Sequence, residues 1–119
     1  MTRDMDLIRQ ILLKVEGYEN PYPVLDPLTI DGYDWHVVGE HVKLLTESDY
    51  LDSMEIDYGL CPTRLTMKGH DFLDSIRNDG VWKKVKEQVT EKGGGFTMEI
   101  LRSLATQALS QLLGLAAGS

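Results

Sequence analysis

The sequence has one cysteine, Cys61, and no apolar run that approaches the length of a membrane span. A lone thiol excludes an intrachain disulfide and fits a reducing compartment. A spanning helix needs about 18 consecutive apolar residues, and the first residues lack the basic region and apolar run of a signal peptide. We therefore expect a soluble cytoplasmic protein with no membrane partner. At 119 residues, with 42% hydrophobic and 26% charged residues, the chain is expected to form a single globular domain overall.

Basic residues are scarce where a DNA-reading helix would need them. Between residues 17 and 60 the only base is Lys43, against ten acids. A recognition helix brings Arg, Lys, Asn or Gln to base edges and phosphates, and the net charge of −7 opposes nucleic-acid binding. The sequence therefore argues against DNA reading by this segment. Six of its acids are predicted to form an acidic contact face: Glu40, Glu47, Asp49, Asp52, Glu55 and Asp57.

The patterns of a catalytic or metal site are also missing. His36 and His41 are five residues apart, which places them on different faces of a helix rather than at the spacing of metal ligands. His41 falls in an apolar stripe and is expected to bond a buried backbone group. No phosphate-binding loop or nucleophile elbow occurs, and nothing in the sequence around Cys61 indicates a lowered thiol pKa. We predict no metal, no cofactor and no enzymatic activity.

Hydrophobic periodicity and turn residues predict the elements along the chain. In order, they are a helix at 4–16, a short edge strand at 28–30, a helix at 34–47, a strand at 50–58, a turn at 59–62, a return strand at 63–66, and helices at 66–77, 81–92 and 97–113. This order indicates an α+β fold. We divide it into a core at 1–79 and a C-terminal helical extension, 80–119, packed on that core.

Three stretches carry a resemblance to a known family: "RDMDLIRQILL", "HVKLLTES" and "RLTMKGHDFLDSIRNDGVWKKVKE". Over nearly the whole chain the sequence resembles an uncharacterised bacterial and prophage family, catalogued only as a domain of unknown function, with a winged-helix-like core. The resemblance implies that fold (helix, short strand, helix, β-hairpin) and an origin in mobile elements. It implies no activity. Winged-helix regulators often have a small apolar segment before the wing, where this chain has Ser48-Asp49-Tyr50, and this departure weakens a DNA-binding assignment.

Two further surfaces follow from the later helices. Bases gather at Arg77, Lys83, Lys84 and Lys86, as a solvated helix face or as a patch for phosphate or an acidic partner. The last helix has an apolar stripe wide enough to need burial on more than one side. That stripe either packs inside its own domain or pairs with a second copy in a homodimer, through Leu101, Leu104, Ala105, Ala108, Leu109 and Leu112.

Together these observations favour a non-enzymatic winged-helix-like protein that contacts another protein, as an interaction or regulatory factor of phage or mobile-element origin. Two alternatives stay open. One is a transcriptional regulator that binds DNA as a dimer through its lysine-bearing helix. The other is an acidic inhibitor that mimics DNA.

Overall fold

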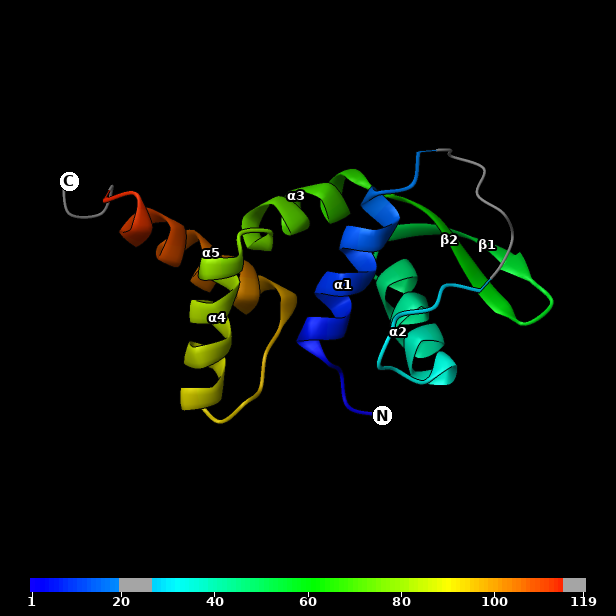
Figure 1. Cartoon of the computed structure of the whole chain (residues 1–119), viewed down its shortest axis with the longest axis horizontal. Helices are drawn as coiled ribbons and strands as arrows, with labels where there is room; N and C mark the ends of the chain where they lie inside the picture. The colour runs from blue at the N-terminus through cyan, green and yellow to red at the C-terminus, as the bar shows by residue number, and fades with distance from the viewer. Residues whose placement is uncertain (20–26, 115–119) are drawn as a thin grey trace. The chain divides into compact units, whose positions relative to one another are not determined.

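Residues 1–19 and 27–114 are described by the computed structural model, and in these ranges the fold consists of five helices and one antiparallel hairpin (Figure 1). The α+β class is therefore confirmed. The elements are α1 (Met5–Glu16), α2 (Trp35–Glu47), β1 (Leu51–Ile56), β2 (Gly59–Leu65), α3 (Met67–Ile76), α4 (Asp79–Glu91) and α5 (Met98–Leu112). The chain divides into two compact units, Met1–Leu73 and Asp74–Ser119, with the division inside α3.

In the first unit, α1 and α2 pack on each other and on the hairpin. The predicted stripe of α1 is buried together with Leu7, and the predicted stripe of α2 is buried as well. These stripes are Ile8, Ile11, Leu12 and Val15 on α1, and Val38, His41, Val42 and Leu45 on α2. Asp4 caps α1, as predicted, because its carboxylate accepts a hydrogen bond from the backbone N–H of Leu7 at 3.1 Å. The spacing of apolar residues was therefore sufficient to predict which helix faces form this core.

The hairpin reverses at a different place from the one predicted. Ile56 pairs with Gly59, so the turn consists of Asp57 and Tyr58, and the predicted turn at residues 59–62 is wrong. Pro62 lies inside β2 opposite Ser53. A proline is tolerated there because each strand of a two-stranded sheet has a free edge and needs no N–H donor on that side. The pairing register shifts between Asp52 and Ser53.

The predicted strand at residues 28–30 is absent, because the sheet contains β1 and β2 alone among the described residues. Leu28 and Ile30 are nevertheless buried. Between them, the carbonyl of Thr29 accepts a hydrogen bond from Lys14 Nζ at 2.7 Å. Burial alternates here as it does in a strand, but a strand also needs a ladder partner. A lysine side chain supplies a hydrogen bond here instead.

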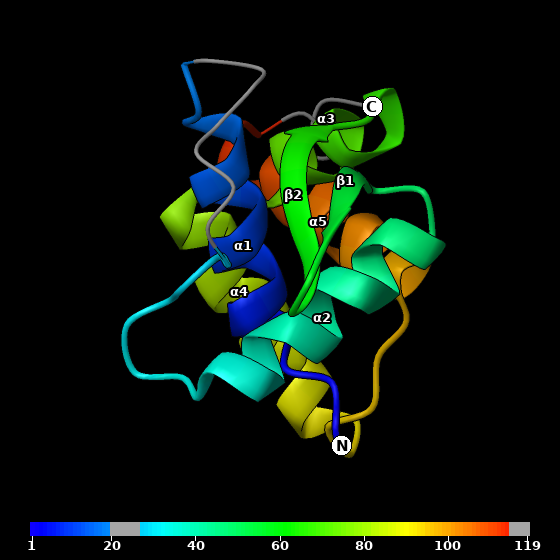
Figure 2. The same ribbon diagram turned by 90° about the vertical axis from the view of Figure 1, so that its right-hand side faces the viewer.

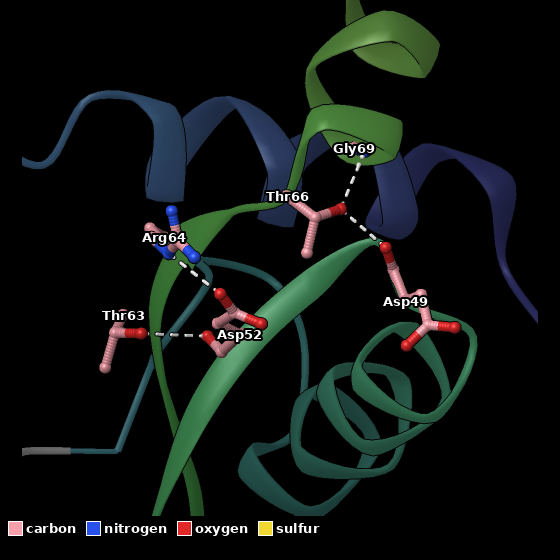
Figure 3. A network of polar contacts seen from close by, with 6 residues as sticks. All are labelled: Asp49, Asp52, Thr63, Arg64, Thr66 and Gly69. Atoms are coloured by element: carbon pink, nitrogen blue, oxygen red, sulfur yellow. Dashed lines mark hydrogen bonds and ion pairs between the residues drawn. The ribbon is translucent and has the colours of Figure 1, made fainter.

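A polar network fixes the start of α3 against the turn between α2 and β1 (Figure 3). Thr66 Oγ1 donates to the carbonyl of Asp49 and accepts the N–H of Gly69 at 3.1 Å. Gly69 lies directly against the backbone of Tyr50, where an added Cβ would stand 2.1 Å from the carbonyl oxygen. Only glycine allows α3 to approach this closely.

In the same view, Asp52 on β1 is held by two neighbours from β2. Arg64 Nε donates to its carboxylate at 2.8 Å, and Thr63 Oγ1 donates to its backbone carbonyl at 3.1 Å (Figure 3). Thr63 is the residue that the register shift leaves without a partner across the sheet, because Pro62 faces Ser53 and Arg64 faces Asp52. The side-chain bonds therefore hold the strands together at the irregularity.

The second unit is built from the end of α3 and the packed helices α4 and α5. Asn78 caps α4 by accepting the N–H of Val81 at 3.0 Å, and Thr97 caps α5 by accepting the N–H of Ile100 at 3.1 Å. The periodicity of α4 predicts Val85, Val89 and either Val81 or Trp82 as inward residues, and all four are buried. No helix in the described part of the chain is long and apolar enough to cross a membrane.

Candidate functional site

A cleft of about 400 Å³ opens on the first unit beside α2 and the β1–β2 turn. The first turn of α2 and the hairpin turn lie at the same end of this unit (Figures 1 and 2). The cleft is lined from three segments: Pro27 and Leu28; Trp35, His36, Gly39, Glu40, Val42 and Lys43; and Tyr58, Gly59 and Leu60. A second, shallower depression involves Gln10, Leu13, Lys14, Ile30 and Asp31.

Two large aromatic side chains line the cleft and are open to solvent. Trp35 is 74% exposed and Tyr58 is 83% exposed. Trp35 is the first residue of α2 and packs edge-on against His36, with ring centroids 5.6 Å apart. Tyr58 occupies the two-residue turn between β1 and β2. The fold thus presents both rings to solvent at one hollow, a composition typical of protein-binding surfaces.

Gly39 shapes the helix side of the cleft. It lies in the middle of α2, where glycine costs about 1 kcal/mol relative to alanine. An added Cβ would meet no atom within 4 Å, so packing does not require a glycine there. The contrast with Gly69, whose place is dictated by Tyr50, is direct. Gly39 therefore leaves this side of the cleft open at a cost in helix stability.

The cleft contains one carboxylate and one ammonium group that face no partner in the described residues. Glu40 and Lys43 lie three residues apart on α2, and neither forms an ion pair or hydrogen bond with a described residue. Asp34 precedes Trp35 and Asp57 precedes Tyr58, and both are exposed. Among the described residues, the lining of the cleft and its immediate sequence neighbours therefore carry three acids and one base.

His41 is structural, as its place in the apolar stripe predicted. It is 1% exposed, its Nδ1 donates to the carbonyl of Val37 at 2.8 Å, and its Nε2 accepts the N–H of Asp4 at 2.9 Å. These two bonds fix the neutral Nδ1–H tautomer, because a backbone N–H can only donate. Through these two bonds His41 ties the start of α1 to α2. Burial of Tyr33, together with the carboxylates of Asp4 and Asp6, raises the pKa of its hydroxyl.

The other candidates for metal or thiol chemistry are dispersed. His36 lines the cleft, whereas His70 lies 4.0 Å from a carboxylate oxygen of Glu16. Cys61 is buried in β2, where its thiol is 3.9 Å from the carbonyl of Pro62. Within residues 1–19 and 27–114, no three His, Cys, Asp or Glu side chains are grouped so that they could hold a metal ion.

The six acids of the predicted contact face are spread over α2 and the hairpin rather than gathered at one point. Asp49 precedes β1 and Asp57 follows it, so the six residues of the strand separate them. Asp52 is paired with Arg64. Glu40 is the acid of this set that lines the cleft. Glu47 and Glu55 are exposed, on α2 and β1 respectively.

The predicted basic patch lies on the second unit. Arg77 donates to the carboxylate of Asp74, with 2.7 Å between Nη2 and Oδ1. Lys83 and Lys84 are exposed on α4, and Lys86 is half-buried. Part of the patch is therefore neutralised within the unit, which leaves Lys83 and Lys84 as its exposed ammonium groups with no partner among the described residues.

The predicted self-association stripe of α5 divides into two parts. Leu101, Leu104, Ala105 and Ala108 are buried within the chain. Leu109 and Leu112 are 40% and 53% exposed, and neighbouring Leu113 is 63% exposed. A second copy would therefore meet the last turns of α5, while the first four residues of the stripe belong to the core. Self-association itself stays a prediction.

The residues that shape the cleft were not selected from the sequence as a site. Trp35, Gly39 and Tyr58 come from a helix start, a helix middle and a turn, so no short motif joins them. One signal was present in the sequence, namely a glycine inside the helical pattern "WHVVGEHVK". The position of Tyr58 in a tight turn became clear only with the strand register.

The geometry above defines a small α+β protein with an aromatic-lined cleft, and comparison with known proteins places it in a family. Residues 2–95 match the family described as "Hypothetical protein (DUF2513)", and the chain belongs to this DUF2513 family. It is also similar to a protein of Haemophilus influenzae (strain ATCC 51907 / DSM 11121 / KW20 / Rd) described as "Uncharacterized protein". The two are 33% identical over 117 residues, covering 95% of this chain and 99% of that protein. No solved structure matches the chain. The resemblance found in the sequence is thus confirmed.

Proposed function

We propose that this protein is a non-enzymatic interaction or regulatory factor that binds another protein through the cleft between α2 and the β1–β2 turn. The observation that carries the proposal is the pair of exposed rings, Trp35 and Tyr58, at one hollow. Tryptophan and tyrosine are enriched among the residues that dominate binding energy in protein interfaces. The rigid core of α1, α2 and the hairpin, which we take to be winged-helix-like, would present them.

The chemistry of the lining supports binding rather than catalysis. The described lining holds His36, Glu40 and Lys43 as ionisable groups but no serine, threonine or cysteine that they could activate. The lining instead combines aromatic rings, aliphatic side chains and two opposite charges, Glu40 and Lys43. Such a surface can exclude water around a partner side chain and orient it by charge.

A DNA-binding regulator is the alternative, favoured by the exposed Lys83 and Lys84 on α4. It predicts duplex binding at about 0.15 M salt that Lys83→Glu with Lys84→Glu abolishes. The proposal above predicts no sequence-specific binding under these conditions, with any low-salt binding lost steeply as salt rises. Electrophoretic mobility or fluorescence anisotropy at several salt concentrations separates the two. If the captured partner is a nucleic-acid enzyme, the DNA-mimic reading becomes the preferred one.

The decisive test is capture of partners from the native host with the full chain as bait. Three baits are compared: the native chain, a Trp35→Ala, Tyr58→Ala variant, and a Met67→Ala control. Met67 is 77% exposed on α3 and does not line the cleft, so the control removes exposed apolar surface elsewhere. The expected result is one protein retained by the native chain and the control but lost by the cleft variant. Equal retention by all three baits, or no retained protein, contradicts the proposal.

A further inference from the structure

The geometry points to an arginine-bearing, basic segment as the occupant of the cleft, an inference that rests on the proposed function. Its first element is the pair of rings. An arginine guanidinium is planar and stacks on aromatic faces, and tryptophan and tyrosine are good partners for a cation. Trp35 and Tyr58 enter the same cleft from different segments, so a side chain inserted there meets an aromatic surface from α2 and from the hairpin.

The second element is Glu40. Its carboxylate lines the cleft and has no partner among the described residues, so both oxygens can accept hydrogen bonds from a ligand. The guanidinium fork matches a carboxylate in a bidentate pair, which is stronger and more directional than a pair with ammonium. This geometry selects arginine over lysine.

The third element is the charge of the segments that form the cleft. Asp34 and Asp57 are exposed and adjoin Trp35 and Tyr58 in the sequence, so with Glu40 these acids outnumber Lys43 by three to one. This net negative charge draws a basic segment and repels an acidic one. The ammonium group of Lys43, which also lines the cleft, repels the same basic ligand. Removing the charge of Glu40 should therefore weaken binding, and removing the charge of Lys43 should strengthen it.

The fourth element is the space above Gly39. Since an added Cβ there would meet no atom within 4 Å, this position leaves room for a partner side chain. A larger side chain at this position fills the cleft without disturbing the core. Gly39→Gln is therefore a blocking variant that the fold tolerates, because glutamine also favours helix over glycine.

The test is binding of three short peptides of equal length to the full ¹⁵N-labelled chain at about 0.15 M salt. One alternates arginine with glycine and serine, one is proline-rich and neutral, and one carries glutamate in place of arginine. The arginine peptide is expected to shift the amide signals of Trp35, Gly39 and Tyr58. Glu40→Gln and Trp35→Ala are each expected to weaken the affinity for the arginine peptide about tenfold, and Gly39→Gln is expected to abolish its binding.

Two matched variants complete the design. Lys43→Gln is expected to raise the affinity for the arginine peptide about two- to fivefold, because it removes a positive charge that repels the peptide. Glu47→Gln removes an exposed acid from the far end of α2 and is expected to leave the affinity within about twofold. Unfolding temperatures of all variants show that the fold persists.

The outcomes separate this inference from the proposed function. If the proline-rich or the acidic peptide shifts the cleft signals instead, the arginine inference is overturned and the cleft remains a binding site. The arginine inference is also overturned if the signal shifts spread over the acidic contact face and do not change with Trp35→Ala. It is overturned too if no signal at the cleft shifts. The proposed function fails separately, when host partners bind equally to the native bait and the cleft variant.

Discussion

Helices α2 and α5 lie in different units and leave different kinds of apolar surface in contact with solvent. On α2 the exposed apolar group is an aromatic ring, Trp35, beside a hollow that Gly39 keeps open. On α5 the exposed groups are aliphatic: Ile100 in the first turn, and Leu109 and Leu112 beyond the buried part of its stripe. Both helices have the same amphipathic periodicity, so periodicity alone does not distinguish them. The difference lies in what surrounds the exposed residue.

That comparison suggests two roles for the two surfaces. An aromatic ring at a concave site can bind one partner side chain specifically, whereas scattered aliphatic side chains contribute mainly non-directional apolar contact. The predictions below test this difference, first by separating core from surface within each unit.

The largest effect is expected in α5, where one leucine is core and another is surface. Leu101 is 0% exposed, so Leu101→Ala should lower the free energy of unfolding by about 2–5 kcal/mol. Leu109→Ala, at 40% exposure, should cost less than about 1 kcal/mol. Urea denaturation of both variants checks the contrast. Equal losses would show that Leu109 is core.

In the first unit, Gly69→Ala should destabilise the fold by about 1–3 kcal/mol or more. Its new Cβ would stand 2.1 Å from the carbonyl oxygen of Tyr50, so α3 must move away from the start of β1. The matched control is Gly39→Ala, because an added Cβ at Gly39 meets no atom within 4 Å. Circular dichroism against temperature measures both. A neutral Gly69→Ala would show that the approach of α3 to Tyr50 is looser than described.

His41→Leu should lower the free energy of unfolding by about 1–3 kcal/mol. The substitution keeps apolar bulk but leaves the N–H of Asp4 without its acceptor at the start of α1. His36→Leu on the exposed side of the same helix should stay within about 0.5 kcal/mol. Urea denaturation of the pair is the measurement, and a similar loss in both variants would argue against the buried bond as the cause.

Gly39→Ala should stabilise the protein by up to about 1 kcal/mol, because alanine favours helix and the added Cβ meets open space. A rise in unfolding temperature is the expected readout. Destabilisation would mean that the fold itself requires Gly39. This glycine would then no longer support the interpretation of the cleft as a binding site.

The smallest effect on stability is expected for Leu112→Glu, at 53% exposure. If the exposed end of α5 pairs two copies, light scattering at tens of micromolar should show a dimer for the native chain and a monomer for the variant. Thr106→Glu, exposed on the same helix, is the control for added charge. A native chain that is monomeric at this concentration removes the homodimer from consideration.

Much of the secondary structure could be predicted from the sequence, because each helix carries its own signals. Asp4 and Thr97 are capping residues ahead of apolar periodicity, and both caps form as expected. The same local reading does not identify Asn78 as a cap, because Asn78-Asp79-Gly80 also has the composition of a break between helices. It also placed the hairpin turn too late and read the buried Leu28 and Ile30 as a strand, because strand pairing depends on distant residues.

By itself, the sequence determined the α+β class, the buried faces of the helices and the burial of His41, since these follow from local spacing and polarity. Tertiary structure alone decided the rest. It placed Tyr58 at the tip of the hairpin and brought it to the same cleft as Trp35 and Gly39. Such a cleft depends on contacts between segments far apart in the chain, and the spacing of residues within one element carries no information about them.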